Sequence, residues 1–251
     1  MAHITQRSCE PKLMSKFKTF QPNEVGHDYV CSDIHGHFSL LEEHLEKVGF
    51  DKRKDRLFCL GDLIDRGDES AMALDYLRKP WFYSILGNHE IMLIEAYETN
   101  KSHVLQQWYQ WGGAWAEDLS RDELEPYYDA MLMLPMVIEL HLKTGAKVGL
   151  VHAELPLNCS WNDVCLGLST KRLTDNSTFT PLLHGMLWNK GQTDSIDAVL
   201  GELDPVDHID HVFLGHTIMP AITTCANRTF MDLGGYETGM LGLLKIEDFL
   251  N

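Results

Sequence analysis

Three consecutive stretches between residues 28 and 98 repeat one order: a short apolar run, a polar cluster and a helix-like segment. Here "DYVCS" leads into "DIHGH", "RLFCLG" leads into "DLIDRGDES", and "WFYSILG" leads into "NHE". Repeating strand, loop and helix units of about 30 residues are what parallel βαβ construction requires. Because open α/β sheets bind ligands at the carboxyl ends of their strands, the three polar clusters are expected to meet at one edge of the sheet.

The rest of the chain predicts a second sheet. Residues 102–135 are helical in pattern and rich in Trp and Tyr, whose large apolar area favours a role in core packing. The later runs "MVIELHL", "AKVGLVHAE", "HVFLGH", "AITTCA" and "GMLGLLKI" follow as strands, which favours a second, mixed sheet. We therefore expect an α/β fold, a two-sheet β-sandwich flanked by helices, with βαβ units in the N-terminal half. Residues 1–25 are predicted to be a flexible arm and residues 26–251 a single domain.

Composition and charge argue against several classes of binding partner and cellular location. The 251 residues carry 21 Lys and Arg against 37 Asp and Glu, a formal net charge of −16, which repels polyanions and argues against nucleic-acid binding. The six cysteines show no CxxC spacing, and Cys31 and Cys59 lie in apolar runs where free thiols act as small hydrophobes. The N-terminal segment lacks the apolar stretch of a signal peptide, and "AMLMLPMVIEL" is too short to span a bilayer. A cytoplasmic protein without membrane attachment is expected.

Residues of the kinds that bind metals follow five of the predicted strands. A single histidine beside a strand is usually a packed or hydrogen-bonded side chain. Buried Asp and His at this density, however, would cost several kcal/mol without a cation. An oxygen and nitrogen donor set without thiolate suits divalent Mn, Fe or Zn. The predicted ligands of two such ions are Asp33, His35, Asp62, Asn88, His152 and His216.

The motifs "SDIHGH", "GDLIDRG", "GNHE", "VHAE" and "GHT", in that order, resemble those of the PPP-family serine/threonine protein phosphatases. The spacing is most similar to the small bacterial and bacteriophage-lambda-type members, and the resemblance extends from Asp28 to Leu244. It implies a calcineurin-like metallophosphoesterase fold and a catalytic domain holding two divalent ions, with Mn²⁺ expected first and Fe or Zn as alternatives. In that resemblance Asp33 and His35 bind the first metal and Asp62 bridges both. Asn88, His152 and His216 would complete the second metal site.

The resemblance also implies how the chemistry is divided. A metal-bridging hydroxide would attack phosphorus directly, and His89, oriented by Asp65, would be the general acid. Arg66 and Asn88 would bind the substrate phosphate. A second family arginine is replaced by Lys190, which keeps the charge but loses the bidentate geometry; Arg172 and Arg228 are candidate substitutes.

Two further acidic residues and one departure concern the supporting structure. Glu90 is read first as a helix N-terminal carboxylate, favoured by the helix dipole. Asp232 matches a supporting strand-end aspartate, and Ser32 stands where glycine is more common. None of the three changes the expected reaction.

The expected function is hydrolysis of phosphoserine and phosphothreonine in phosphoproteins or phosphopeptides, with phosphotyrosine also allowed, and without an obligate regulatory subunit. One alternative is a diadenosine tetraphosphate hydrolase or other nucleotide phosphoesterase on the same fold. Asp65 argues against the dinucleotide hydrolases, and Ile218, in place of a second histidine after "GHT", argues against the wider phosphodiesterases. A second alternative is an inactive phosphopeptide- or metal-binding module. The complete ligand set and the presence of His89 make it the less favoured one.

Overall fold

Two mixed β-sheets form the centre of the molecule in the computed structural model, which describes residues 16–155, 159–169, 181–189 and 203–250. One sheet has the strand order β10-β2-β3-β4 and the other the order β1-β5-β6-β7-β9-β8. In the smaller sheet β2, β3 and β4 are parallel, while β10 is antiparallel to β2. Its strands are β2 Asp28–Cys31, β3 Arg56–Cys59, β4 Phe82–Ser84 and β10 Leu243–Lys245.

The larger sheet combines parallel and antiparallel pairs. Strand β5 is parallel to β1 and antiparallel to β6, and β7 is parallel to both β6 and β9. Strand β8 closes the sheet as an antiparallel partner of β9. Its strands are β1 Phe17–Phe20, β5 Val137–His141, β6 Lys147–Val151, β7 His211–Leu214, β8 Thr223–Cys225 and β9 Arg228–Phe230. The predicted two-sheet arrangement is confirmed.

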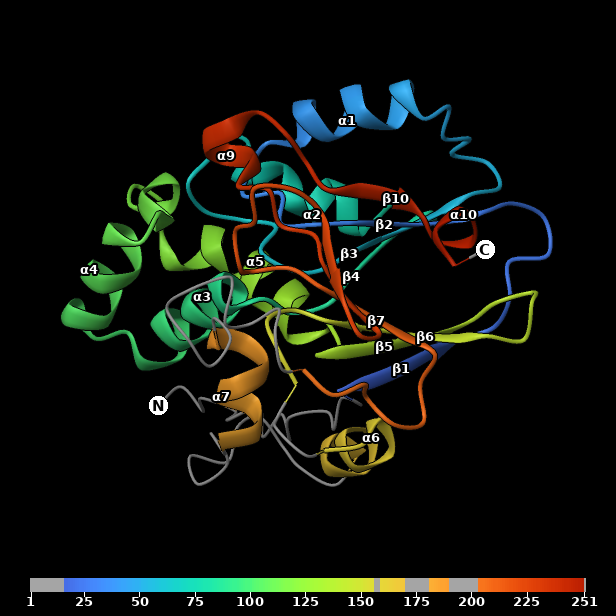
Figure 1. The fold of residues 1–251 in the computed structure, drawn as a ribbon. Coiled ribbons are helices and arrows are strands. Elements are labelled where there is room, and N and C mark those ends of the chain that lie inside the picture. The colour runs from blue at the N-terminus through green and yellow to red at the C-terminus, as the bar shows by residue number, and fades with distance from the viewer. Residues whose placement is uncertain (1–15, 156–158, 170–180, 190–202, 251) are drawn as a thin grey trace, which may run out of the picture.

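An apolar layer fills the space between the two sheets. It combines Val30 and Phe58 of the smaller sheet with Ile138, Leu150 and Phe213 of the larger one, and all five side chains are buried. Helices cover the outer faces, with α1 on one side of the two sheets and α6 on the other (Figure 1). The helical elements are α1 Phe38–Lys47, η1 Ser70–Met72, α2 Ala73–Leu77, α3 Asn88–Thr99, α4 Ser102–Gln110, η2 Gly113–Ala116, α5 Arg121–Leu132, α6 Trp161–Ser169, α7 Pro181–Trp188, α9 Gly235–Thr238 and α10 Ile246–Phe249.

Helix α1 illustrates how the sequence pattern positions a helix. Phe38, Leu41 and Leu45 lie three and four residues apart, so they share one face of the helix. They pack with Cys31 and Cys59 of the outer sheet face, and both cysteines are buried thiols that serve as small apolar side chains, as expected. This packing fixes the loop between β2 and α1, which carries Asp33 and His35.

The expectation of a flexible arm over residues 1–25 is wrong for one segment. Phe17–Phe20 is strand β1, which pairs with β5 from Phe17 opposite Val137 to Phe20 opposite Leu140. Aromatic packing explains the pairing, since the Phe20 ring contacts those of Phe58 and Tyr83 edge-on. Four residues are too few to show a clear period-2 pattern, and the sequence therefore did not reveal this strand.

Within the described ranges, no helix is both long enough and apolar enough to cross a membrane.

Candidate active site

The carboxyl ends of the strands bring the predicted ligands together, all of them buried except His216, which is half-buried. Asp33 and His35 follow β2, Asp62 follows β3, and Asn88 is the first residue of α3, which follows β4. The loops that carry them turn sharply, because His35, Asp62 and His216 have left-handed φ angles of 45°, 49° and 60°. Such a conformation costs a residue with a Cβ of order 1 kcal/mol or more and often marks a functional site. The structure thus brings together the residues that the sequence singled out, and their roles as metal ligands stay a prediction.

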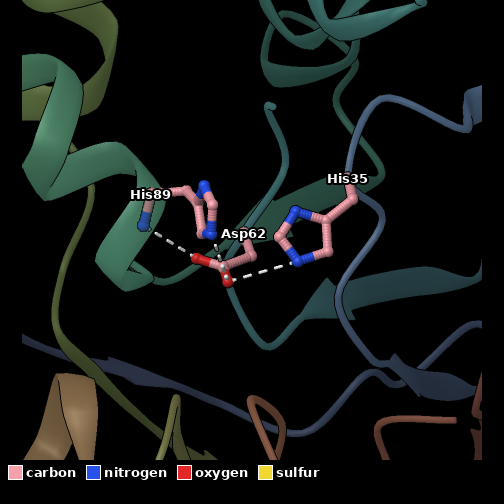
Figure 2. A group of neighbouring side chains, drawn as sticks. All are labelled: His35, Asp62 and His89. Carbon is pink, nitrogen blue, oxygen red and sulfur yellow. Dashed lines mark hydrogen bonds and ion pairs between the residues drawn. The ribbon is translucent and has the colours of Figure 1, made fainter. Parts of the chain in front are cut away.

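Asp62 lies at the centre of the cluster, between imidazoles on two sides (Figure 2). Its Oδ2 is 3.5 Å from His35 Nε2 and 4.0 Å from His89 Nε2, and its Oδ1 accepts a hydrogen bond of 3.0 Å from the backbone N–H of His89. Oδ1 is also 3.5 Å from His152 Nε2. The close approach of α3 depends on Gly87, where a Cβ would come within 2.1 Å of Asp62 Oδ1. One carboxylate thus faces two separate groups of nitrogen ligands, as a bridging ligand must.

Among the described residues, two groups of potential metal ligands share Asp62. The first contains His35, Asp62 and His89, and the second contains Asp62, His152 and His216. The second group agrees with the predicted second metal site, and Asn88 adjoins it with its Oδ1 at 2.9 Å from His152 Nε2. The first group contains His35 and Asp62, as predicted, together with His89, and it does not include Asp33. Asp33 instead accepts hydrogen bonds from the backbone N–H of His216, at 3.1 Å to each carboxylate oxygen.

The histidine tautomers suit metal binding. His35 Nδ1 is 3.1 Å from the carbonyl oxygen of Ile64, and His152 Nδ1 is 2.7 Å from that of Leu60. The network therefore assigns the protons to Nδ1 and turns the Nε2 lone pairs toward Asp62, which is how outer hydrogen bonds orient metal-binding histidines. Burial lowers the pKa of both rings and keeps them neutral. In this tautomer His152 Nε2 directs a lone pair at the oxygen of Asn88, an arrangement that a cation between them would stabilise.

The carboxylates also fit a cation. Burial, then the charges of Asp232 and Asp62, raise the pKa of Asp33 well above its ordinary value. Asp232 is itself buried, accepts a hydrogen bond from the N–H of Gly234, and has its pKa raised to about 6 by burial and by Asp62. Burial would also raise the pKa of Asp62, but the surrounding imidazoles, His152 foremost, lower it. Divalent ions would relieve this concentration of negative charge. The residues present therefore fit the metals that the motifs imply.

Glu90 organises the loop that carries Asp62. As expected for the first turn of a helix, it accepts a hydrogen bond at 2.8 Å from the backbone N–H of Gly87. It also accepts from the N–H groups of Asp62 at 2.9 Å and Leu63 at 2.8 Å, although it is fully buried. Burial and the charge of Asp62 raise its pKa to about 7. Its helix-capping role is only part of its function, because it also ties β3's loop to α3.

His89 and Asp65 form a buried pair beside the cluster. His89 Nδ1 donates to Asp65 Oδ2 at 2.7 Å, and its Nε2 faces the site. Burial opposes protonation of His89, but the nearby carboxylates of Asp62 and Asp65 outweigh it and raise the pKa of the ring. The pair has the geometry of an imidazole that could donate a proton from Nε2.

Arg66 lies at the exposed side of this pair. Its two terminal nitrogens are 2.9 Å from His35 Nε2 and 3.2 Å from His89 Nε2. The guanidinium is held over the Tyr236 ring, 4.3 Å from its centroid, and the same ring contacts His35 edge-on. Such a planar fork can bind two oxygens of a phosphate.

The other positively charged side chains considered as phosphate ligands are either outside the described residues or do not face the site. Lys190 and Arg172 lie outside the described residues. Arg228 cannot replace a phosphate-binding arginine, because it is buried at the start of β9, bonded to the carbonyl oxygen of Asp204 and 3.4 Å from Glu154.

Comparison with known proteins decides the family. The family model of the calcineurin-like phosphoesterases matches residues 29–220, which include every predicted metal ligand. The chain belongs to the calcineurin-like phosphoesterase family.

Individual phosphoesterase relatives extend the match. Serine/threonine-protein phosphatase 2 of Escherichia coli (strain K12) is 31% identical over 93% of this chain and 99% of its own length. The symmetrical bis(5'-nucleosyl)-tetraphosphatase of Pseudomonas fluorescens (strain SBW25) is 30% identical, but over 64% of this chain and 55% of its own. A crystal structure titled as a putative diadenosine tetraphosphatase superposes with a TM-score of 0.56 at 19% identity, covering 90% of this chain and 91% of that one, which shows the shared fold.

Three residues of this phosphoesterase site were not identified from the sequence. Trp108 and Trp115 donate hydrogen bonds to Asp65, and Tyr236 supports Arg66. Core packing was correctly expected for Trp108, which is buried. The available signal was that a buried indole N–H needs an acceptor, but the sequence does not say which one.

Proposed function

We propose that this phosphoesterase is a two-metal phosphoprotein phosphatase that hydrolyses phosphoserine and phosphothreonine, with phosphotyrosine as a further substrate. The observation that carries the proposal is the Asp62 carboxylate, placed between two imidazole groups, with the His89–Asp65 pair beside it. The full-length similarity to a bacterial serine/threonine-protein phosphatase supports it over the dinucleotide hydrolase, whose match is partial.

Two sets of residues would hold the metals. Asp33, His35 and Asp62 would bind the first ion, and Asn88, His152 and His216 would bind the second together with Asp62. In the second set, ligand atoms of Asp62, His152 and His216 lie within 4.8 Å of one another. When bound, two divalent ions lower the pKa of a coordinated water and polarise the phosphoryl oxygens. Mn²⁺ is the first candidate, because oxygen and imidazole ligands suit it, and Fe or Zn would also fit.

The other side chains would bind phosphate and move the leaving-group proton. Arg66, exposed and held by Tyr236, would bind two phosphate oxygens. Lys190 would add a second positive charge. His89 would donate its Nε2 proton to the departing seryl or threonyl oxygen while Asp65 holds Nδ1, and the raised pKa of His89 favours the protonated form that this step needs. The substrates would be phosphoproteins in the cytoplasm, consistent with the buried thiols Cys31 and Cys59.

The test compares three substrates under one condition. Metal-stripped protein is reconstituted with Mn²⁺, its bound metal is counted, and hydrolysis of a phosphoserine peptide, a phosphotyrosine peptide and diadenosine tetraphosphate is measured. We expect about two ions per chain and a higher kcat/KM for the phosphopeptides. Preference for the dinucleotide would assign the protein to the alternative class. Two bound metals without turnover of any substrate would leave a binding module.

The His89 assignment has its own test. His89→Asn should lower kcat on the phosphoserine peptide by about 10²-fold or more. It should lower kcat much less on p-nitrophenyl phosphate, because that leaving group needs little protonation. Metal content should stay unchanged, and His44→Asn on α1 is the control. Equal loss on both substrates would remove His89 from the acid role.

A further inference from the structure

The helical segment between α3 and α5 reaches into the site through two indoles. Trp108 of α4 donates from Nε1 to Asp65 Oδ2 at 2.8 Å, and Trp115 of η2 donates from Nε1 to Asp65 Oδ1 at 2.7 Å. The two rings also contact each other edge-on, at 6.3 Å between centroids. Both oxygens of one carboxylate are therefore held from the same side of the molecule.

Asp65 is fully buried, so its orientation depends on its hydrogen bonds. Oδ2 accepts from Trp108 and from His89 Nδ1, whereas Oδ1 accepts from Trp115. Turning the carboxylate would break the indole bonds and leave buried donors unpaired, which is unfavourable. The indoles thus fix the direction in which Asp65 presents Oδ2 to His89, and with it the direction of His89 Nε2.

The same segment also contacts the phosphate-binding arginine. The carbonyl oxygen of Gly112 accepts a 2.9 Å hydrogen bond from the backbone N–H of Arg66. Gly112 has a φ of 118°, and a Cβ there would come within 2.8 Å of Arg66 Cγ, so only glycine permits this approach. Residues 108–115 therefore secure Asp65 and Arg66, two neighbours that both have left-handed backbones.

We propose that Trp108 and Trp115 are positioning residues for the general acid, acting on His89 through Asp65. The inference rests on the proposed acid role of His89. It assigns a function to the N–H groups of the two indoles, beyond the area that their rings bury.

Substitution by phenylalanine removes the indole N–H and keeps an aromatic ring. For Trp108→Phe and Trp115→Phe we expect kcat on the phosphoserine peptide to fall by about tenfold each, a part of the effect of losing the acid. KM and the kcat on p-nitrophenyl phosphate should stay within about twofold, because phosphate binding and metal content are unchanged. Trp115 is half-buried, so Trp115→Phe is the variant less prone to misfold.

The chain offers a matched control. Trp161 of α6 is buried and also donates from Nε1 to a carboxylate, Glu139 Oε2, at 2.7 Å. That carboxylate lies on β5, and its other oxygen is 2.6 Å from His141 Nε2, so Trp161→Phe makes the same chemical change elsewhere. It should leave kcat on both substrates unchanged, and a tenfold loss would show a general effect of losing a buried indole bond.

A double-mutant cycle separates positioning from other effects. In the His89→Asn background, Trp115→Phe should lower kcat on the phosphoserine peptide by less than about twofold, because its route through His89 is gone. A full tenfold loss in that background would overturn the proposal, as would equal loss on both substrates in the single variants.

If the enzyme prefers the dinucleotide, the phosphatase proposal fails but the same cycle is run on that substrate. Absence of any effect of His89→Asn would instead show that the acid assignment is the part that fails.

Discussion

Strands β2, β3 and β7 differ between their two ends, here called the amino edge and the carboxyl edge. Polar side chains are paired with one another at the amino edge, whereas carboxylates gather at the carboxyl edge. At the amino ends, Asp28 of β2 and Arg56 of β3 form a bidentate ion pair with two contacts of 2.7 Å, and His211 of β7 bonds to Thr229 at 2.8 Å. At the carboxyl ends, the same strands lead to Asp33, Asp62 and His216. Burial there, and then the nearby carboxylates of Asp232 and Asp62, raise the pKa of Asp33. The amino edge neutralises its polar groups internally for stability, whereas the carboxyl edge concentrates charge for a cation and a phosphate.

The largest effect should come from the carboxyl edge. Asp62→Asn removes a charge from the only carboxylate that faces both ligand groups among the described residues. We expect bound metal and activity to be lost together, with kcat/KM reduced on the order of 10³-fold or more. Metal analysis and phosphopeptide hydrolysis measure the two losses. Retention of both ions would contradict the bridging assignment.

The same substitution at the amino edge should act on stability alone. Asp28→Asn leaves the largely buried guanidinium of Arg56 without its anion, which should reduce the free energy of unfolding by about 3 kcal/mol. Urea denaturation of the metal-stripped protein gives this value. Activity of the folded variant should match wild type, and a loss of metal would show that the two edges are not independent.

His211, at the amino edge, should make the free energy of unfolding depend on pH. Burial lowers its pKa from the ordinary 6.5 to about 4, so the unfolded chain binds a proton more tightly than the folded one. The neutral ring stabilises the fold fully above about pH 6.5, and this stability is lost as the pH falls toward 4. From about pH 7 to about pH 5 the loss should be about 2 kcal/mol. Urea titrations of wild type and His211→Gln would detect it, since the variant should lack this component; identical slopes in both proteins would exclude His211 as the cause.

The smallest expected change is an increase in stability, opposite in sign to the effect of Asp28→Asn. Asp33→Asn in the metal-stripped protein removes a buried charge that faces Asp232 and Asp62, while one oxygen can still accept from the N–H of His216. We expect the free energy of unfolding at neutral pH to increase by about 1 kcal/mol, and metal binding to weaken. Destabilisation, as at Asp28, would mean that the two edges do not differ in the way described.

The regular periodicity of residues 28–98 was sufficient to predict the parallel strands, the edge at which they end and the convergence of the ligands. Strand β1 was not predictable, because its four residues acquire a partner only through long-range pairing with β5. The role of Arg228 was likewise decided by tertiary structure, since it faces Glu154 rather than a phosphate.

The residues that hold the site's side chains in place were not fully predicted, for the same reason. Glu90 was expected to cap a helix and does, but its bonds to the loop after β3 depend on how that loop folds back. The two indoles that hold Asp65 lie 43 and 50 residues away in sequence. Sequence spacing indicates which side chains can bind a metal, but not which distant side chains hold them in place.

The left-handed backbone at His35, Asp62, Asp65, Arg66 and His216 has a consequence for protein engineering. A designer who copied only these five side chains onto ordinary strands or helices would point them in other directions, because regular elements do not offer that backbone shape. A transplant of this centre to another scaffold would have to include the loops themselves, together with Glu90 and the two tryptophans that brace them.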